Sequence, residues 1–161
     1  MQKVIVIGCP GSGKSTFSVN LHKKTSLPLY HLDMLYWNAD KTTVEKAVFL
    51  NRLNKRLAEN EWIIDGNYIS TLELRLKYCD TIIFLDYPTD ICLDGIKARQ
   101  GKPRPDMPWV ETEEDAEFIE FIKNFESETR PRVLELLNKY SYKDIYIFKN
   151  RTETEEFLNN L

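Results

Sequence analysis

The chain has 161 residues, of which 42% are hydrophobic and 29% are charged, a balance typical of globular proteins that excludes a disordered or fibrous chain. The 22 lysines and arginines and the 25 aspartates and glutamates give a net charge of −3, which disfavours a protein dedicated to coating DNA. Since a domain averages roughly 150 residues, we expect residues 1–161 to form a single domain.

The cysteines and the apolar runs indicate the compartment. Cys9, Cys79 and Cys92 form no C-x-x-C pair and have no histidine cluster nearby, so neither a disulfide framework nor a zinc site is expected. No apolar run approaches the roughly 18 residues of a membrane span, and the run before Gly8 is too short for the core of a signal peptide. We therefore expect a cytoplasmic protein without a membrane segment.

Short apolar runs alternate with helical patterns along the chain. In chain order, strands are predicted at residues 4–7, 27–32, 62–64, 81–85 and 145–148. Helices are predicted directly after Lys14 and at residues 42–60, 90–99, 113–140 and 152–161. Because strands alternating with helices favour a parallel sheet covered on both faces, we expect a three-layer α/β/α fold.

The first predicted strand runs into a phosphate-binding loop. The stretch Gly8-Cys9-Pro10-Gly11-Ser12-Gly13-Lys14-Ser15 matches the pattern G-x-x-x-x-G-K-[ST] between a strand and a helix. Glycines let successive backbone N–H groups point at an anion, and the helix N-terminus adds partial positive charge. We expect Lys14 to reach the β- and γ-phosphates of ATP and the Ser15 hydroxyl to bind Mg²⁺. The expected nucleotide-binding residues are Gly8, Pro10, Gly11, Ser12, Gly13, Lys14, Ser15 and Thr16.

The rest of the chain narrows the class of P-loop protein. It contains no D-x-x-G pattern, and Asn54-Lys55-Arg56-Leu57 lacks the aspartate of the guanine-binding pattern N-K-x-D. The length is also too short for most ATPase motor modules. These observations favour a compact protein of the kinase type.

Aspartates follow three of the predicted strands. Ligands of open parallel sheets bind at the carboxyl ends of the strands, where Asp33, Asp65 and Asp86 are expected. Phosphoryl transfer needs a metal near the phosphates and a group that orients the attacking oxygen. We assign Asp65 to the metal, directly or through water, and Asp33 to the acceptor as an orienting group or base. Asp86, which precedes Tyr87-Pro88, also suits simple turn chemistry, and a turn or helix-cap role is the alternative for all three.

A stretch rich in proline and glycine, residues 100–109, interrupts the helical pattern. Arg99 and Arg104 are expected to close over the transferring phosphoryl group as part of a lid inserted at approximately residues 99–115. Arg130 and Arg132 are further candidates for this role. The alternative is a solvated loop, whose surface ion pairs contribute little.

In its motifs the chain resembles the P-loop nucleotide-kinase superfamily of the adenylate-kinase-like type, and more closely the bacterial DNA topology modulation protein (FlaR-type) family. The closer resemblance extends over essentially the whole chain and is carried by residues 8–16, 31–37, 62–68, 84–88 and 104–107. It implies a five-stranded parallel sheet in the order 2-3-1-4-5 with a helical lid over the phosphates. That order places Asp65 beside the P-loop strand, as a Walker B-like carboxylate. The family name implies an effect on DNA topology, which none of these residues explains.

The acceptor side differs from that of adenylate kinases. After the third strand those enzymes carry Asp-Gly-Phe/Tyr-Pro-Arg, whereas here Asp65-Gly66 is followed by Asn67-Tyr68, and no arginine occurs before Arg75. The Asp33 pattern resembles that of shikimate- and gluconate-type kinases, whose acceptor is a hydroxyl. Tyr36 and Trp37 are expected either to stack on an acceptor or to pack on the core. By the same resemblance, residues 149–151 lie where nucleotide kinases bind adenine.

The sequence therefore predicts a kinase that transfers the γ-phosphoryl group of Mg·ATP to a small acceptor, which is a nucleotide, a nucleoside or a hydroxyl metabolite. The expected metal-binding residues are Ser15 and Asp65, and the expected catalytic residues are Lys14, Asp33, Asp65, Arg99 and Arg104. The alternative is a nucleotide-binding regulatory protein that affects DNA topology or gene expression without phosphorylating an acceptor. We expect a monomer or a homodimer, with no membrane partner.

Overall fold

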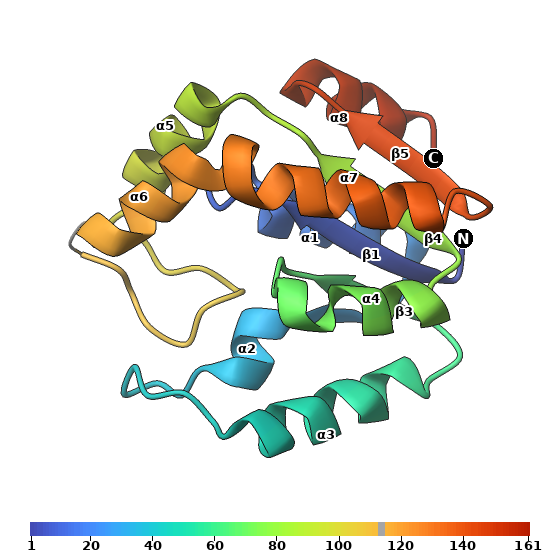
Figure 1. Ribbon diagram of the computed structural model, residues 1–161, viewed down its shortest axis with the longest axis horizontal. Coiled ribbons are helices and arrows are strands. Elements are labelled where there is room, and N and C mark those ends of the chain that lie inside the picture. Colours follow the sequence, from blue (N-terminus) through green and yellow to red (C-terminus); the bar gives the residue numbers. More distant parts are fainter. Residues whose placement is uncertain (113–114) are drawn as a thin grey trace.

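Five strands form one parallel sheet in the computed structural model, which describes residues 1–112 and 115–161 (Figure 1). The strands are β1 (Lys3–Gly8), β2 (Leu29–His31), β3 (Trp62–Asp65), β4 (Thr81–Leu85) and β5 (Asp144–Phe148). They lie in the order β2-β3-β1-β4-β5, and every neighbouring pair is parallel. The predicted fold class and the strand order 2-3-1-4-5 are confirmed.

The central strands β1, β3 and β4 form the middle of the core. Ile5, Ile63 and Phe84 are fully buried, as expected of apolar parallel strands that are covered on both faces. β5 is an edge strand, and Tyr146 and Ile147 on it stay partly exposed. Complete burial therefore distinguishes the central strands from β5, although residues 145–148 of β5 are also an unbroken apolar run.

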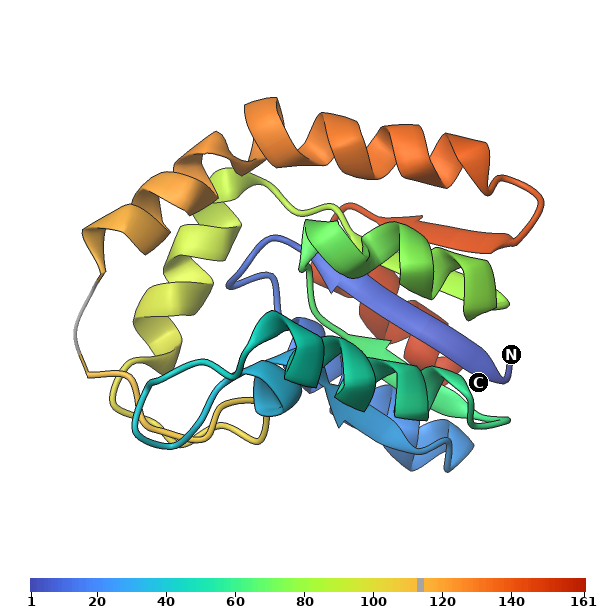
Figure 2. The same ribbon diagram turned by 60° about the horizontal axis from the view of Figure 1, so that its bottom comes forward.

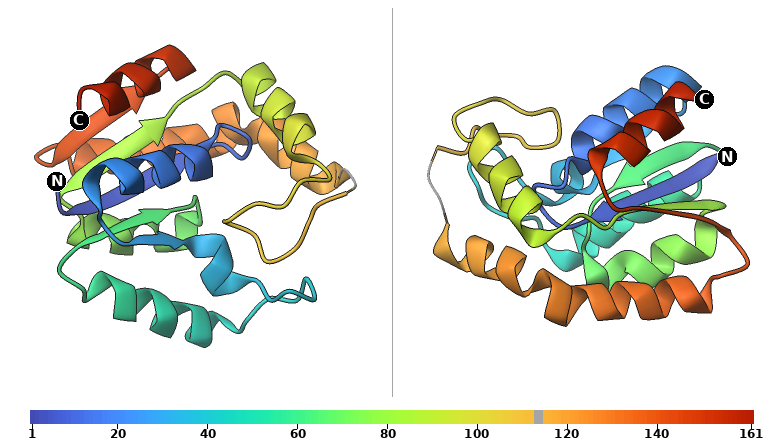
Figure 3. Two further views of the ribbon diagram at one scale, coloured as in Figure 1. Left: turned by 180° about the vertical axis from the view of Figure 1, so that it is seen from behind. Right: turned by 90° about the horizontal axis from the view of Figure 1, so that it is seen from above.

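Helices cover both faces of the sheet. They are α1 (Lys14–Thr25), α2 (Leu32–Tyr36), α3 (Lys46–Leu57), α4 (Ile69–Tyr78), α5 (Thr89–Arg99), α6 (Ala116–Asn124), the π-helical turn η1 (Phe125–Thr129), α7 (Arg130–Lys139) and α8 (Arg151–Asn159). α1 and α8 lie on one face, and α4 and α7 lie on the other (Figure 2; Figure 3, right). Among these helices, none is both long and apolar enough to cross a membrane.

Several element bounds differ from the sequence prediction. The strand predicted at residues 27–32 spans only Leu29–His31, and α2 begins immediately after it. The helix predicted at residues 42–60 starts at Lys46, because Thr43 pairs with Trp37 in an isolated antiparallel bridge. The helix predicted at residues 113–140 appears as α6, η1 and α7 in succession (Figure 2), and residues 113–114 lie outside the described part of the chain. α4 is an addition that the sequence pattern does not predict.

The strand order brings the strand-end residues together. Asp65 at the end of β3 is in register with Val6 of β1 on one side and with His31 of β2 on the other. Gly8, the last residue of β1, begins the phosphate-binding loop. The carboxylate after β3 therefore lies between the P-loop strand and the β2–α2 junction that carries Asp33.

Candidate active site

The loop between β1 and α1 has the backbone of an anion cradle. Gly11 and Gly13 have φ angles of 85° and 93°, in the left-handed region that favours glycine. A Cβ atom on Gly11 would lie 2.0 Å from the carbonyl oxygen of Cys92 in α5, so a larger residue does not fit. α1 has no side-chain cap and no acidic residue in its first turn, which leaves its first N–H groups available to an anion.

Two polar contacts hold this loop. The Asn67 Oδ1 atom accepts a hydrogen bond from the backbone N–H of Gly8 at 3.1 Å. The Lys14 Nζ atom donates to the Cys9 carbonyl oxygen at 3.4 Å, a long bond for a charged donor. Burial lowers the pKa of Lys14, and the charge of Asp65 offsets part of that shift. Lys14 is thus a weakly bonded cation at the mouth of the cradle, suited to a phosphate oxygen.

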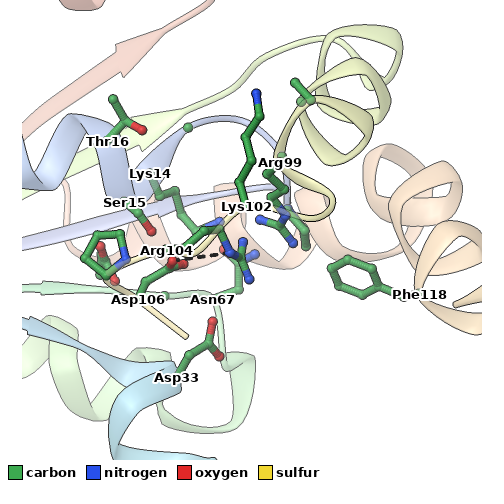
Figure 4. Close-up of a pocket in the computed structure, with 18 of the residues that line it drawn as sticks. Lys14, Ser15, Thr16, Asp33, Asn67, Arg99, Lys102, Arg104, Asp106 and Phe118 are labelled. Atoms are coloured by element: carbon green, nitrogen blue, oxygen red, sulfur yellow. Dashed lines mark ion pairs between the residues drawn. The ribbon is translucent and has the colours of Figure 1, made fainter. Parts of the chain in front are cut away.

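A cavity of about 700 Å³ opens beside the phosphate-binding loop, between the ends of the strands, α5 and the segment that follows α5 (Figure 4). The predicted catalytic residues all line it, and these are Lys14, Asp33, Asp65, Arg99 and Arg104. Among the predicted nucleotide-binding residues, those that line it are Pro10, Gly11, Gly13, Lys14, Ser15 and Thr16. Gly8 and Ser12 are buried beneath the loop and do not line it.

Asp65 is 4% exposed at the end of β3. Its Oδ2 atom lies 2.8 Å from Nδ1 of His31. Burial by itself lowers the pKa of His31, but the hydrogen bond to Asp65 and the charges of Asp65, Asp106 and Asp33 outweigh it and raise that pKa. A histidine with a raised pKa carries a proton more readily, so His31 holds the Asp65 carboxylate in place as a hydrogen-bond donor.

The oxygen donors at this point of the cavity fit Mg²⁺. The Asp65 carboxylate and the Ser15 hydroxyl both line the cavity, and Mg²⁺ prefers oxygen ligands supplied by one or two side chains together with phosphates. Two side-chain oxygen donors beside a phosphate cradle suit a cation that shares its ligands with a bound nucleotide.

Asp33 lies in the first turn of α2, and the Tyr68 hydroxyl donates a hydrogen bond to its Oδ1 atom. Burial raises the pKa of Asp33, whereas the Tyr68 hydrogen bond and the charge of Lys14 lower it. Tyr68 precedes α4 with φ 24° and ψ 71°, which is unfavourable for a residue that has a Cβ atom. The strained backbone of Tyr68 places its hydroxyl on the carboxylate that we predict to orient the acceptor.

The arginines of the predicted lid, Arg99 and Arg104, are partly buried and form ion pairs. Arg99 Nε and Arg104 Nη2 lie 3.6 and 3.5 Å from the same oxygen of Glu111, and their side chains are 22% and 13% exposed. Burial and the neighbouring Arg104 charge lower the pKa of Arg99, whose guanidinium also lies 5.8 Å from the centre of the Phe118 ring. The boundaries of the lid at approximately 99–115 and its closure stay predictions.

A second cluster of charges surrounds Asp86, outside the main cavity. Arg130 donates from Nε and Nη2 to both carboxylate oxygens of Asp86 at 2.9–3.1 Å, and Lys149 also pairs with it. Burial raises the pKa of Asp86, but the hydrogen bonds from Arg130 and Lys149 outweigh it and lower that pKa. Arg132 pairs with Glu135 on the surface. Neither Arg130 nor Arg132 lines the main cavity, so only Arg99 and Arg104 of the candidate lid arginines reach it.

The aromatic residues after Asp33 divide between packing and the cavity. Tyr36 packs edge-on against Phe49 and Tyr68, with ring centroids 5.2 Å apart in both pairs. Trp37 lines the cavity and meets the edge of Trp109 at 5.2 Å. The sequence leaves two roles open for both residues, stacking on an acceptor or packing on the core. In the structure Tyr36 packs against other aromatic rings, and Trp37 lines the cavity.

Of the residues 149–151, which the sequence marks as candidates for the base site, Arg151 alone lines the main cavity. Its Nη1 atom donates to the Ser12 carbonyl oxygen at 3.3 Å. Lys149 pairs with Asp86, and Asn150 caps α8 by accepting from the backbone N–H of Glu153. Their contact with adenine stays a prediction.

In the sequence, Asn67, Tyr68 and Asp106 enter only within the motifs of the family resemblance and are assigned no role in the site, although all three line the cavity. The available signal for the first two is a polar run that directly follows Asp65-Gly66 at the end of a strand. Asp106 lies in the proline-rich stretch, and only the folded path of that stretch brings it to the cavity. Arg75 is fully buried and donates to the carbonyl oxygens of Gly66, Asn67 and Tyr68, so it holds the loop that carries these side chains.

The fold is similar to that of solved shikimate kinases. The enzyme from Bacteroides thetaiotaomicron matches with a TM-score of 0.57 and 19% identity, over 98% of this chain and 94% of that one. The enzyme from Aquifex aeolicus matches with 0.58 and 22%, over 98% and 91%. The enzyme from Acinetobacter baumannii, solved in complex with shikimate, matches with 0.63 and 16%, over 99% and 90%. This chain therefore has the fold of a P-loop kinase.

Among curated proteins, the uncharacterized protein YqaC of Bacillus subtilis (strain 168) is 34% identical over 104 residues. The match covers 62% of this chain and 57% of YqaC, so the chain spans little more than half the length of that relative. No family model matches the chain. The closer resemblance to the FlaR-type family stays a prediction.

Proposed function

We propose that this protein is a Mg·ATP-dependent phosphotransferase, which transfers the γ-phosphoryl group of ATP to a hydroxyl group of a small acceptor. The observation that carries this proposal is one cavity lined by Lys14 of the phosphate-binding loop, Asp65 after β3 and Asp33 on α2. A phosphate cradle, a carboxylate for the metal and a group that orients the attacking oxygen are the parts that phosphoryl transfer requires. The likeness to shikimate kinases supports a P-loop kinase that acts on a small substrate.

Each side chain has a role in this proposal. The loop N–H groups and Lys14 bind the β- and γ-phosphates, and Ser15 and Asp65 hold the Mg²⁺, which offsets phosphate charge. Asp33 accepts the proton of the acceptor hydroxyl while the hydroxyl oxygen bonds to the γ-phosphorus. The bond from that phosphorus to the β–γ bridging oxygen breaks, and ADP leaves. Arg99 and Arg104 stabilise the negative charge on the transferred group.

Two finer assignments belong to the same proposal. Membership of the FlaR-type DNA topology modulation family is supported by the sequence motifs that extend along the chain. A cytoplasmic location is supported by the three cysteines, all of which are free and buried, as is usual in a reducing compartment.

ADP formation tests the proposed reaction. The protein is incubated with Mg·ATP and a panel of nucleosides, nucleoside monophosphates and small hydroxyl metabolites that includes shikimate. We expect at least one acceptor to raise the rate of ADP formation above the rate with ATP alone. Lys14→Ala removes the cation that binds the phosphates, and we expect it to lower the stimulated rate by about 100-fold or more. Lys24→Ala, an exposed site on the same helix, is the matched control and keeps the wild-type rate.

Binding of Mg·ATP without stimulation by any acceptor would contradict the kinase. That outcome favours the alternative of a nucleotide-binding regulatory protein that affects DNA topology or gene expression. The affinity for DNA is then measured against salt concentration, because a slope near zero excludes direct contact with the phosphate backbone.

A further inference from the structure

The acceptor end of the cavity carries carboxylates where an anionic substrate would need cations. We infer that the acceptor is a polyhydroxylated molecule without a phosphate or carboxylate group, such as a sugar, a polyol or a nucleoside, and that Asp106 binds one of its hydroxyls beside Asp33. This inference rests on the proposed function, since it names the substrate class of the same site.

Three carboxylates, of Asp33, Asp65 and Asp106, line the cavity. The charges of Asp106 and Asp65 both raise the pKa of Asp33, and the charges of all three raise that of His31. Figure 4 shows Asp33 and Asp106 beside the same open space, together with Asn67. If His31 holds Asp65 and Asp65 serves the metal, the two carboxylates that remain for the acceptor are Asp33 and Asp106.

Asp106 has hydrogen-bonding capacity that the described part of the protein leaves unused. The residue is 7% exposed, and its Oδ1 atom has no hydrogen-bond partner within residues 1–112 and 115–161. The nearest cationic atom, Arg104 Nε, lies 3.6 Å from it, which is beyond hydrogen-bond distance. A buried carboxylate oxygen without a donor is costly, and a hydroxyl group of an acceptor supplies that donor.

Most cations around the cavity already have a carboxylate or a carbonyl oxygen as a partner. Arg75 is 0% exposed and donates to the carbonyl oxygens of the loop after β3, so it does not reach the cavity. Arg99 Nε and Arg104 Nη2 lie within ion-pair distance of the Glu111 carboxylate, at 3.6 and 3.5 Å. Arg104 Nε is at ion-pair distance from Asp106 as well, and Arg151 donates to the phosphate-binding loop at Ser12.

The remaining two cations that line the cavity are Lys14 and Lys102. Lys14 is at the phosphate cradle, where burial lowers its pKa, the charges of Asp65 and Asp33 raise it and that of Arg99 lowers it, while Lys102 is exposed. A phosphate or carboxylate on the acceptor would therefore add negative charge beside Asp33 and Asp106. Like charges in a partly buried site disfavour binding, which selects against anionic acceptors.

Trp37 supplies an apolar wall near these carboxylates. It follows α2, four residues after Asp33, and lines the cavity. Its ring is fixed by an edge contact with Trp109, the centroids being 5.2 Å apart. A fixed aromatic ring beside hydroxyl-binding carboxylates suits the apolar face of a sugar ring or a nucleobase.

Matched pairs of acceptors test this inference. The initial rate of ADP formation with wild-type protein is compared for adenosine and AMP, ribose and ribose 5-phosphate, glucose and gluconate, and glycerol and glycerol 3-phosphate. We expect kcat/KM for the uncharged member of the productive pair to exceed that of the anionic member by at least tenfold. We also expect Asp106→Asn to lower kcat/KM for that uncharged acceptor by about tenfold, while KM for ATP stays within twofold. Asp94→Asn, on the exposed face of α5, is the control.

The possible outcomes separate this inference from the proposed function. Preferential phosphorylation of the anionic members would overturn the inference and leave the kinase proposal standing. Stimulation by the uncharged members with no effect of Asp106→Asn would overturn the role of Asp106. Absence of stimulation by any acceptor would overturn both proposals.

Discussion

Tyr68 concentrates backbone strain next to the carboxylate that we assign to the acceptor. Its φ of 24° costs on the order of 1–3 kcal/mol for a residue that is not glycine. The Arg75 guanidinium holds the carbonyl oxygens on either side of this strain, at Asn67 and Tyr68. The Tyr68 hydroxyl bonds to Asp33, so the strain is located where the proposed reaction needs a positioned base.

Tyr68→Phe tests the effect of this hydroxyl on Asp33. Burial raises the pKa of Asp33, and the Tyr68 hydrogen bond offsets part of that rise. Without the hydroxyl the pKa of Asp33 rises further, and a base acts only in its ionised form. We therefore expect the acidic limb of the pH profile of kcat/KM to move to higher pH, so that activity falls more at pH 6 than at pH 8.

Tyr78→Phe provides the matched control, because Tyr78 ends the same helix and is 48% exposed. Its profile should coincide with that of the wild type. An acidic limb that stays in place, or that moves to lower pH, in Tyr68→Phe would show that Asp33 is not the base or that the hydroxyl does not bond to it.

At the scale of elements, the contact between α5 and the phosphate-binding loop sets the shape of the cradle. A Cβ atom on Gly95 would lie 2.0 Å from the carbonyl oxygen of Gly11, and a Cβ atom on Gly11 would lie 2.0 Å from that of Cys92. Two backbones therefore touch without any side chain between them. The loop cannot keep its path if either glycine gains a side chain.

Gly95→Ala should weaken the binding of ATP. In an exposed helix this substitution stabilises by up to about 1 kcal/mol, whereas here the added methyl group must displace the loop. We expect the Kd for Mg·ATP to rise at least tenfold, about 1.4 kcal/mol, together with a lower melting temperature. Asp94→Ala, the exposed neighbour on α5, should leave both quantities unchanged. A Gly95→Ala protein with wild-type affinity would show that the loop adapts and that this contact does not shape the cradle.

The elements show which parts of the fold can be predicted from sequence. β1, β3 and β4 are continuous apolar runs, and the phosphate-binding loop joins a strand to a helix by a specific pattern, so both are predicted correctly. α4 is missed because Arg75 lies on its buried face among Leu72 and Leu76 and interrupts the apolar stripe. The charge is accommodated by carbonyl oxygens of a loop, a contact that helical periodicity does not reveal.

The residues of the candidate site can likewise be predicted only in part from the sequence. Lys14 is predictable from the pattern of the phosphate-binding loop. Asp33 and Asp65 are predictable because they stand at or just after strand ends, which parallel strands bring together. The pairing of Arg99 and Arg104 with Glu111 depends on the path of an irregular segment, which local sequence does not determine. Asp106 reaches the cavity by that same path, and for this reason it is not predicted.

The whole molecule forms its cavity from segments that are distant in sequence. The P-loop and α1 contribute the nucleotide side, the β2–α2 and β3–α4 junctions contribute the carboxylates, and α5 with the following segment contributes the arginines. Figure 1 shows these parts around one end of the sheet. Binding of a nucleotide to such a site stabilises the folded state, by about 2.7 kcal/mol when the free ligand is at 100 times its Kd.

The most direct test of this account is a calorimetric titration of the protein with ATP in the presence and absence of Mg²⁺. We predict saturable heat with one site per chain, with tighter binding when Mg²⁺ is present, and at least a tenfold weaker Kd in Lys14→Ala than in the exposed-site variant Lys24→Ala. A folded wild-type protein that gives no heat with ATP under either condition would contradict the nucleotide site, and the proposed phosphotransferase with it.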